Sequence, residues 1–107
     1  MIVSMIAGRL LSAPELRRTK DGRTIVVASV KARIGRDNTE AWQVHAHERI
    51  AQAALRSCAS GDFVSIQGVP STRSASIKGE PVIQRILHAE TVLPLKPEGG
   101  LDADALS

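Results

Sequence analysis

Two stretches of alternating apolar and polar residues, joined by a short turn, constrain the fold of this chain most strongly. Residues 24–34 are rich in β-branched side chains, and their apolar face alternates with a face that becomes basic toward the end of the segment. Residues 40–47 alternate in the same way, and residues 35–39 have the composition of a turn. A two-residue period places successive side chains on opposite faces of a strand. The segment from Gly22 to His47 therefore predicts a β-hairpin with one apolar face.

The rest of the chain predicts three more strands and two polar connections. We expect strands at residues 2–11, 62–69 and 82–93, a charged connection at 14–20, and a polar, basic hairpin arm at 70–81. The first strand should bend or bulge at Gly8, because an isolated glycine in a strand pattern marks such sites. Asp21-Gly22 is a strong turn signal.

One segment, residues 48–59, has the composition of a helix. It is rich in Ala, Leu, Gln, Glu and Arg, which are good helix formers. Its expected apolar stripe, by spacing of three and four residues, is Ile50, Ala53, Ala54 and Cys58. Gly61 follows where a helix stop is expected.

The order of these elements is strand, strand, strand, helix, strand, strand. A helix between the third and fourth strands of a five-stranded set is typical of the OB-fold, a small Greek-key β-barrel. Other small α+β folds share this order. We predict an all-β, five-stranded OB-fold barrel with one helix over residues 1–95. Residues 96–107, with two glycines and three acidic residues, are predicted to be a short disordered tail.

Composition excludes several classes of protein. The chain has no apolar run of about 18 residues, which a transmembrane helix needs, and its first residues lack the basic start of a signal peptide. The single cysteine, Cys58, allows no internal disulfide and is consistent with a reducing cytoplasm. Only 2% of the residues are aromatic, so Val, Ile, Leu and Ala must fill the core.

The charge is distributed unevenly along the chain. Residues 1–96 carry 14 basic and 8 acidic side chains, whereas the tail beyond them is acidic. A basic body predicts attraction to a polyanion, of which nucleic acid is the common case. A solvated surface that keeps the protein soluble is the alternative interpretation.

Five segments carry a resemblance to a known family. They are residues 3–22 (VSMIAGRLLSAPELRRTKDG), 24–33 (TIVVASVKAR), 39–51 (TEAWQVHAHERIA), 61–68 (GDFVSIQG) and 84–95 (QRILHAETVLPL). In this order and spacing the chain resembles the bacterial single-stranded DNA-binding proteins (SSB) over about residues 1–95. The resemblance implies an OB-fold without enzymatic activity, in the bacterial cytoplasm and associated with the nucleoid. It also implies a homo-oligomer, usually a tetramer, and sequence-tolerant binding of single-stranded DNA.

A second relative of the same family is also similar. Primosomal replication protein N is a smaller, typically dimeric OB protein, and its last strand tends to contain the Leu-His-Ala-Glu sequence found here at residues 87–90. This similarity implies an alternative function, an OB module whose main role is protein–protein interaction in a replication-restart assembly.

The candidate binding residues follow from the chemistry of single-stranded DNA. Such binding usually combines a cationic groove with aromatic rings on which bases stack. The places where SSB proteins carry these rings are poor in them here, and His47 stands where the family usually has Phe or Trp. Binding should therefore depend mainly on charge. The candidates are Arg17, Arg18, Lys20, Lys31, Arg33, Arg36, Trp42, His45, His47, Phe63, Arg73 and Lys78. Trp42 and Phe63 remain open between base platforms and core or interface residues.

His45-x-His47 places two imidazoles on one strand face, with His88 or Glu48 as a third metal ligand. Without a second cysteine or a fixed third ligand this pattern is a weak metal signal, and we expect no metal and no cofactor. The chain contains no P-loop, GxSxG, HExxH or dinucleotide-binding motif. The leading hypothesis is a non-catalytic single-stranded DNA-binding protein of DNA replication, repair, recombination or mobile-element maintenance.

Overall fold

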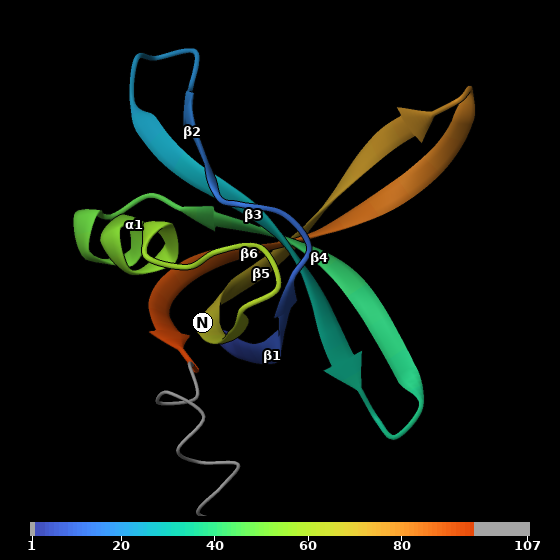
Figure 1. Ribbon diagram of the computed structural model, residues 1–107. Coiled ribbons are helices and arrows are strands. Elements are labelled where there is room, and N and C mark those ends of the chain that lie inside the picture. Colours follow the sequence, from blue (N-terminus) through green and yellow to red (C-terminus); the bar gives the residue numbers. More distant parts are fainter. Residues whose placement is uncertain (1, 96–107) are drawn as a thin grey trace, which may run out of the picture.

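The computed structural model describes residues 2–95, which form six strands and one helix (Figure 1). The elements are β1 Ser4–Leu10, β2 Glu15–Arg18, β3 Thr24–Ile34, β4 Asn38–Ala46, α1 Arg49–Arg56, β5 Phe63–Ile77 and β6 Glu80–Pro94. The predicted acidic tail lies outside the described residues. Within residues 2–95, no helix is long and apolar enough to cross a membrane.

Five of the strands close into a barrel. The sheet order is β1-β5-β6-β4-β3-β2, and an additional pairing of β1 with β3 completes the ring. β4 and β6 pair in parallel, whereas the other pairs are antiparallel. β2 lies outside the ring and pairs only with β3 among the described strands. The predicted five-stranded OB-fold barrel with a helix after its third long strand is confirmed.

The interior of the barrel is aliphatic, as the composition requires. Alternate residues of β3, from Val26 to Ala32, point inward together with Val44 and Ala46 of β4. None of the buried side chains in residues 2–95 is polar or charged. The predicted hairpin from Gly22 to His47 is confirmed, with β3 at its predicted bounds. All specificity for a polar ligand must therefore come from the outside of the barrel.

The barrel closes tightly at two glycines. A Cβ atom at Gly8 would lie 2.1 Å from the carbonyl oxygen of Lys31, and one at Gly68 would lie 2.1 Å from that of His88. At Gly8 the strand β1 pairs with both β3 and β5, so its backbone passes close to β3. A side chain at either glycine would force neighbouring backbones apart.

Two predictions about local structure were wrong. Residues 14–20 were expected to be a charged connection, but Glu15–Arg18 forms β2 along the edge of β3. All four residues of β2 are exposed, so no apolar alternation marks this strand. The predicted apolar stripe of α1 was wrong in part: Cys58 is buried and Ala54 packs against the core, but Ile50 is 84% exposed and the buried residues within the helix are Ala51 and Leu55.

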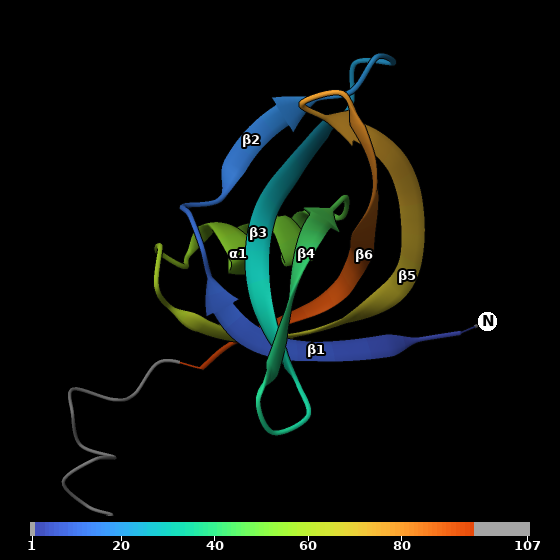
Figure 2. The ribbon, with the colours of Figure 1, turned by 90° about the vertical axis from the view of Figure 1, so that its right-hand side faces the viewer.

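The helix packs across one end of the barrel against β6, β3 and β4. The Gln52 side chain fixes it there, because its Nε2 donates hydrogen bonds to the carbonyl oxygens of Thr24, Ala46 and His47 at 2.8, 3.2 and 3.0 Å. In Figure 2, α1 lies behind β3 and β4, so it leaves the opposite side of these strands uncovered.

The predicted hairpin arm is not a separate segment. β5 and β6 continue into it and pair as far as Ile77 and Glu80. Lys78 and Gly79 form the turn, both with positive φ values of 53° and 80°, as a two-residue hairpin turn of type I′ requires. Figure 1 shows this hairpin, the β2–β3 hairpin and the β3–β4 hairpin extending from the barrel in three directions.

Candidate nucleic-acid interface

Strand register defines the outside of the barrel on the side away from α1. Directly paired residues lie on the same face of a sheet, and Val27, His45, His88 and Val69 are paired in series across β3, β4, β6 and β5. The outward residues of these strands and of β2 form the surface that we call the outer face. Its members are Glu15, Arg17, Ile25, Val27, Ser29, Lys31, Arg33, Thr39, Ala41, Gln43, His45, Gln84, Ile86, His88, Val69, Ser71 and Arg73. Figure 2 shows β2, β3, β4, β6 and β5 side by side in this order.

At the β3–β4 hairpin the outer face continues into a groove. The groove has a volume of about 640 Å³ and is lined by Gly8, Arg9, Leu11, Lys31, Arg33, Arg36, Asp37, Asn38, Thr39 and Phe63. We call it the basic groove, because four of these side chains are cationic. Arg9 pairs directly with Lys31 between β1 and β3 and with Phe63 between β1 and β5. The register thus places two cations and the ring side by side.

The cations of the basic groove are not neutralised by neighbouring carboxylates. Within residues 2–95, Arg9, Lys31, Arg33 and Arg36 take part in no ion pair. The Nη2 of Arg33 instead donates to the carbonyl oxygen of Arg36 at 3.2 Å, which orients one guanidinium within the hairpin. Asp37 also lines the groove but forms no ion pair with these four cations, so the lining keeps a net positive charge that attracts an anion.

Phe63 supplies the exposed ring of this groove. It is 46% exposed, and the Cζ of Arg9 lies 4.6 Å from its ring centroid, a cation–π contact. This arrangement leaves part of the ring accessible beside a guanidinium. Both groups stack well on nucleobases.

Trp42 has a different environment. It packs against the buried core opposite Val30, and its Nε1 donates to a carboxylate oxygen of Glu40 at 2.9 Å. Glu40 also forms an ion pair with Arg85 at 3.3 Å. The structure therefore favours the core interpretation of Trp42 over the base-platform interpretation.

The structure brings only some of the predicted residues together. Lys31, Arg33, Arg36 and Phe63 meet in the basic groove. Three others lie elsewhere: Arg18 points to the opposite side of β2 from Arg17, Lys20 lies in the β2–β3 turn and Lys78 at the tip of the β5–β6 hairpin.

Arg17 and Arg73 lie on the outer face, but each has a protein partner. Arg17 is paired with Glu15 at 2.9 Å. Arg73 donates to the Gln84 side chain at 2.8 Å across the β5–β6 hairpin. Their side chains are therefore partly engaged before any ligand binds.

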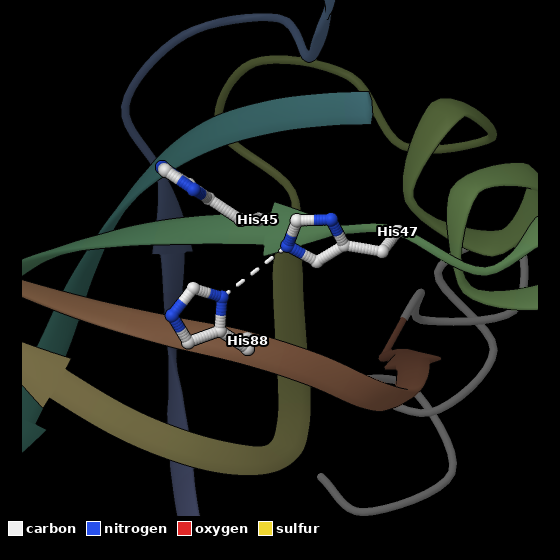
Figure 3. Close-up of side chains that lie close together, drawn as sticks. All are labelled: His45, His47 and His88. Carbon is white, nitrogen blue, oxygen red and sulfur yellow. Dashed lines mark hydrogen bonds between the residues drawn. The ribbon is translucent and has the colours of Figure 1, made fainter. Parts of the chain in front are cut away.

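A cluster of three imidazoles lies on the outer face nearer to the helix (Figure 3). His47 Nε2 and His88 Nδ1 are 3.3 Å apart, and the Oγ of Ser71 lies 3.0 Å from His88 Nε2. The His45 ring meets the His88 ring edge-on, with centroids 5.7 Å apart. We call His45, His47 and His88 the histidine cluster.

The histidine cluster is neutral near pH 7 at its two half-buried members. Burial, followed by the neighbouring His88, His47, Arg73 and Arg17, lowers the pKa of His45 to about 4. Burial and the nearby His47 also lower the pKa of His88. Neutral imidazoles can stack on bases but add no positive charge to the outer face.

Sequence reasoning missed Arg9 as a binding residue, and it considered His88 only as a metal ligand. Arg9 belongs to the groove because β1 pairs with β3 beside Lys31. That pairing joins residues more than twenty positions apart, and no local pattern signals it.

No protein-family model matches this sequence, and no curated protein matches it significantly. Solved structures do match. The SSB of Plasmodium falciparum, in a structure described as a complex with ssDNA, aligns at a TM-score of 0.67 and 18% identity, covering 90% of this chain and 96% of that one. The small single-stranded DNA-binding protein of Streptomyces coelicolor aligns at a TM-score of 0.66 and 23% identity, covering 85% and 91%. This chain has the SSB fold. The resemblance seen in the five sequence segments is confirmed at the level of the fold.

Proposed function

We propose that this SSB-fold protein binds single-stranded DNA without catalysing a reaction, and that the basic groove is the main contact. The observation that carries the proposal is the meeting of Arg9, Lys31, Arg33 and Arg36 around the exposed Phe63 ring. A cationic channel with a stacking ring is the arrangement that single-stranded nucleic acids require. The similar Plasmodium structure is described as a complex with ssDNA, which supports the same ligand class here.

The basic groove would divide the work of binding between charge and stacking. Lys31, Arg33 and Arg36 would contact phosphates, which carry no sequence information. Phe63 and the Arg9 guanidinium would stack on bases, which tolerates any sequence because every base has a π-face. From the groove the strand would cross the outer face, where Ser29 and Gln43 offer hydrogen bonds. We infer a role in DNA replication, repair, recombination or mobile-element maintenance.

Fluorescence anisotropy with a labelled dT oligonucleotide tests this function. We expect binding at about 50 mM salt that weakens steeply toward about 300 mM, because phosphate contacts release counterions. A duplex of the same length should bind more weakly. The proposal is overturned by absence of binding at low salt, or by tighter binding to the duplex.

A double variant in the groove and a single control variant on α1 locate the contact. Lys31→Ala combined with Arg33→Ala should weaken binding about tenfold or more, since each removes a phosphate contact. Arg56→Ala is the control, because Arg56 is an exposed cation in the last turn of α1, on the other side of the barrel. Equal affinities of the two variants would contradict the assignment to the basic groove.

A second candidate function is protein–protein interaction, as in a replication-restart assembly of the primosomal protein N type. It is favoured by exposed apolar side chains on the outward surface of β1 and β6. Met5 and Leu93 are 67% and 56% exposed, and both strands flank β5. A second copy of this chain is the occupant we propose for this surface, giving a homo-oligomer.

Light scattering separates the two functions at the level of assembly. A tetramer would favour DNA binding of the SSB type, and a dimer would favour protein interaction of the primosomal protein N type. If Lys31→Ala with Arg33→Ala leaves DNA affinity unchanged while capture of a protein partner persists, protein interaction is the main function. Met5→Ser should weaken the assembly, and either a monomeric wild type or an oligomer that Met5→Ser leaves unchanged would contradict the interface.

A further inference from the structure

The histidine cluster has a geometry that exceeds what stacking on DNA needs. One member lies on β4, one on β6 and one directly after β4, and a nitrogen of each ring lies within 4.8 Å of a nitrogen of both others. They converge from His45 and His88, which are directly paired, and from His47, which follows β4. Figure 3 shows His47 and His88 facing each other, with the His45 ring beside them.

The separations match those in a transition-metal site. Two imidazole nitrogens bound tetrahedrally to Zn²⁺ at about 2.1 Å lie about 3.4 Å apart. The 3.3 Å between His47 Nε2 and His88 Nδ1 already has this value. The remaining nitrogens need to approach by about 1.4 Å at most, which side-chain rotation can provide.

A neighbouring group holds His88 in the required tautomer. When Ser71 Oγ accepts a hydrogen bond from His88 Nε2–H, the lone pair of Nδ1 points toward His47. Partners of this kind, which bind the second nitrogen of a ligating imidazole, orient metal ligands in known sites. In this tautomer His47 Nε2–H donates to His88 Nδ1, and a metal ion would replace this hydrogen bond once His47 carries its proton on Nδ1.

The chemistry of the cluster suits a borderline metal ion. Imidazole nitrogens select zinc and its neighbours in the first transition row rather than Mg²⁺ or Ca²⁺, which prefer oxygen ligands. The exposed His47 leaves the cluster open to solvent.

We propose that His45, His47 and His88 form a three-histidine site for a divalent transition metal ion of the Zn²⁺ type. A fourth ligand position is left for water. The argument for this metal site does not rest on the proposal that the protein binds DNA. Arg17 and Arg73 lie near enough to His45 to oppose a cation, although each already has its own protein partner. We therefore expect a weaker site than a closed structural zinc site.

Titration of the full-length, tag-free protein with ZnCl₂ tests the site. Native mass spectrometry and calorimetry should show one Zn²⁺ per chain. Co²⁺ should give the visible absorption of a low-coordinate, nitrogen-ligated ion. His47→Gln should weaken zinc binding at least tenfold, in the range found when metal-site partners are removed. His47 is exposed, so this change should not unfold the protein.

Two control variants exclude the other candidate ligands. Cys58→Ser and Glu48→Gln should bind zinc like the wild type, since Cys58 is buried beneath the helix and Glu48 is not part of the cluster. The proposal is overturned if the wild type binds no stoichiometric zinc. It is equally overturned if His47→Gln and His88→Gln both retain wild-type affinity, or if Cys58→Ser abolishes binding.

Discussion

The basic groove and the histidine cluster occupy two ends of one surface and differ in how they carry charge. The pairing of β3 with β4 connects them: Lys31 pairs with Ala41 at the groove, and Val27 pairs with His45 at the cluster. Four residues along a strand separate them, or about 13 Å. The groove holds guanidinium and ammonium groups that form no ion pair among the described residues. The cluster holds the half-buried imidazoles of His45 and His88, whose lowered pKa values make them neutral near pH 7.

The difference shows how burial sorts basic side chains on a barrel surface. Long Arg and Lys side chains at the exposed β3–β4 hairpin keep their charged ends in water. The shorter His side chains lie against the buried Val27 and Ile86, where burial penalises the protonated form. The outer face thus carries guanidinium and ammonium groups at the basic groove and imidazoles that are neutral near pH 7 at the histidine cluster.

Reversing the charge of the basic groove should have the largest effect on DNA affinity. Lys31→Glu with Arg33→Glu should lower the affinity for a dT oligonucleotide about a hundredfold at low salt, which is about 2.7 kcal/mol. Attraction to phosphates is then replaced by repulsion. Arg56→Glu, which reverses one charge on α1 instead of two, should shift the affinity less than about twofold. Anisotropy titrations measure all three proteins, and similar losses in both variants would show that net charge matters rather than the groove.

The exposed ring should contribute a smaller, salt-independent part. Phe63→Ala should weaken binding about tenfold, within the range of about 1–3 kcal/mol for stacking on one base. Phe63→Tyr should bind like the wild type because the ring remains. The comparison is best made at about 300 mM salt, where phosphate contacts contribute less. If Phe63→Ala binds as well as Phe63→Tyr there, the ring is not a base platform.

The sequence predicts the parts of the outer face that depend on neighbouring strands, but not those that depend on pairing between distant strands. The period of residues 24–34 and 40–47 predicts the β3–β4 hairpin, and with it Lys31, Arg33 and Arg36 at one end. Arg9 could not be predicted, because its place beside Lys31 depends on the closure of β1 onto β3. β2 was missed for a different reason. All four of its residues are exposed, so they show no apolar alternation. The strand is held by backbone pairing with β3, which does not depend on the side chains.

The histidine cluster shows the same limit. The spacing of His45 and His47 indicates a shared face, but His88 and Glu48 were equal candidates for a third ligand. The parallel pairing of β4 with β6 decides between them by placing His88 opposite His45. Parallel neighbours are joined by long connections, so no local signal specifies which residues meet.

The histidine cluster should make the stability of the protein depend on pH. The pKa of His45 is lowered to about 4 in the folded chain, from an ordinary value of 6.5. The unfolded chain therefore binds a proton more readily between these values, and the free energy of unfolding falls as the pH decreases from 7 toward 4. His88 contributes with the same sign. Because His45 is only half buried, we expect a loss on the order of 1 kcal/mol.

Urea unfolding at pH 7.5 and pH 5.0, in the presence of EDTA, measures this effect. His45→Gln should reduce the loss of stability, whereas Arg56→Ala should leave it unchanged. Asp21, whose pKa is lowered by the Thr19 hydroxyl, stays ionised throughout this window and does not contribute. A pH dependence that is identical in wild type and His45→Gln would show that the ring is not protonated preferentially in the unfolded chain.

The smallest expected effect, a change in the salt dependence of DNA affinity, should distinguish the basic groove from the histidine cluster. If Lys31 contacts one phosphate, Lys31→Ala should make the slope of log K against log salt shallower by about 0.7, the value for one contact to a single strand. His45→Ala should leave that slope unchanged at pH 7.5, because a neutral ring displaces no counterion. Affinities at five or more salt concentrations give the slopes. Equal slopes for wild type and Lys31→Ala would remove Lys31 from the phosphate path, and a shallower slope for His45→Ala would mean that the cluster is charged when DNA is bound.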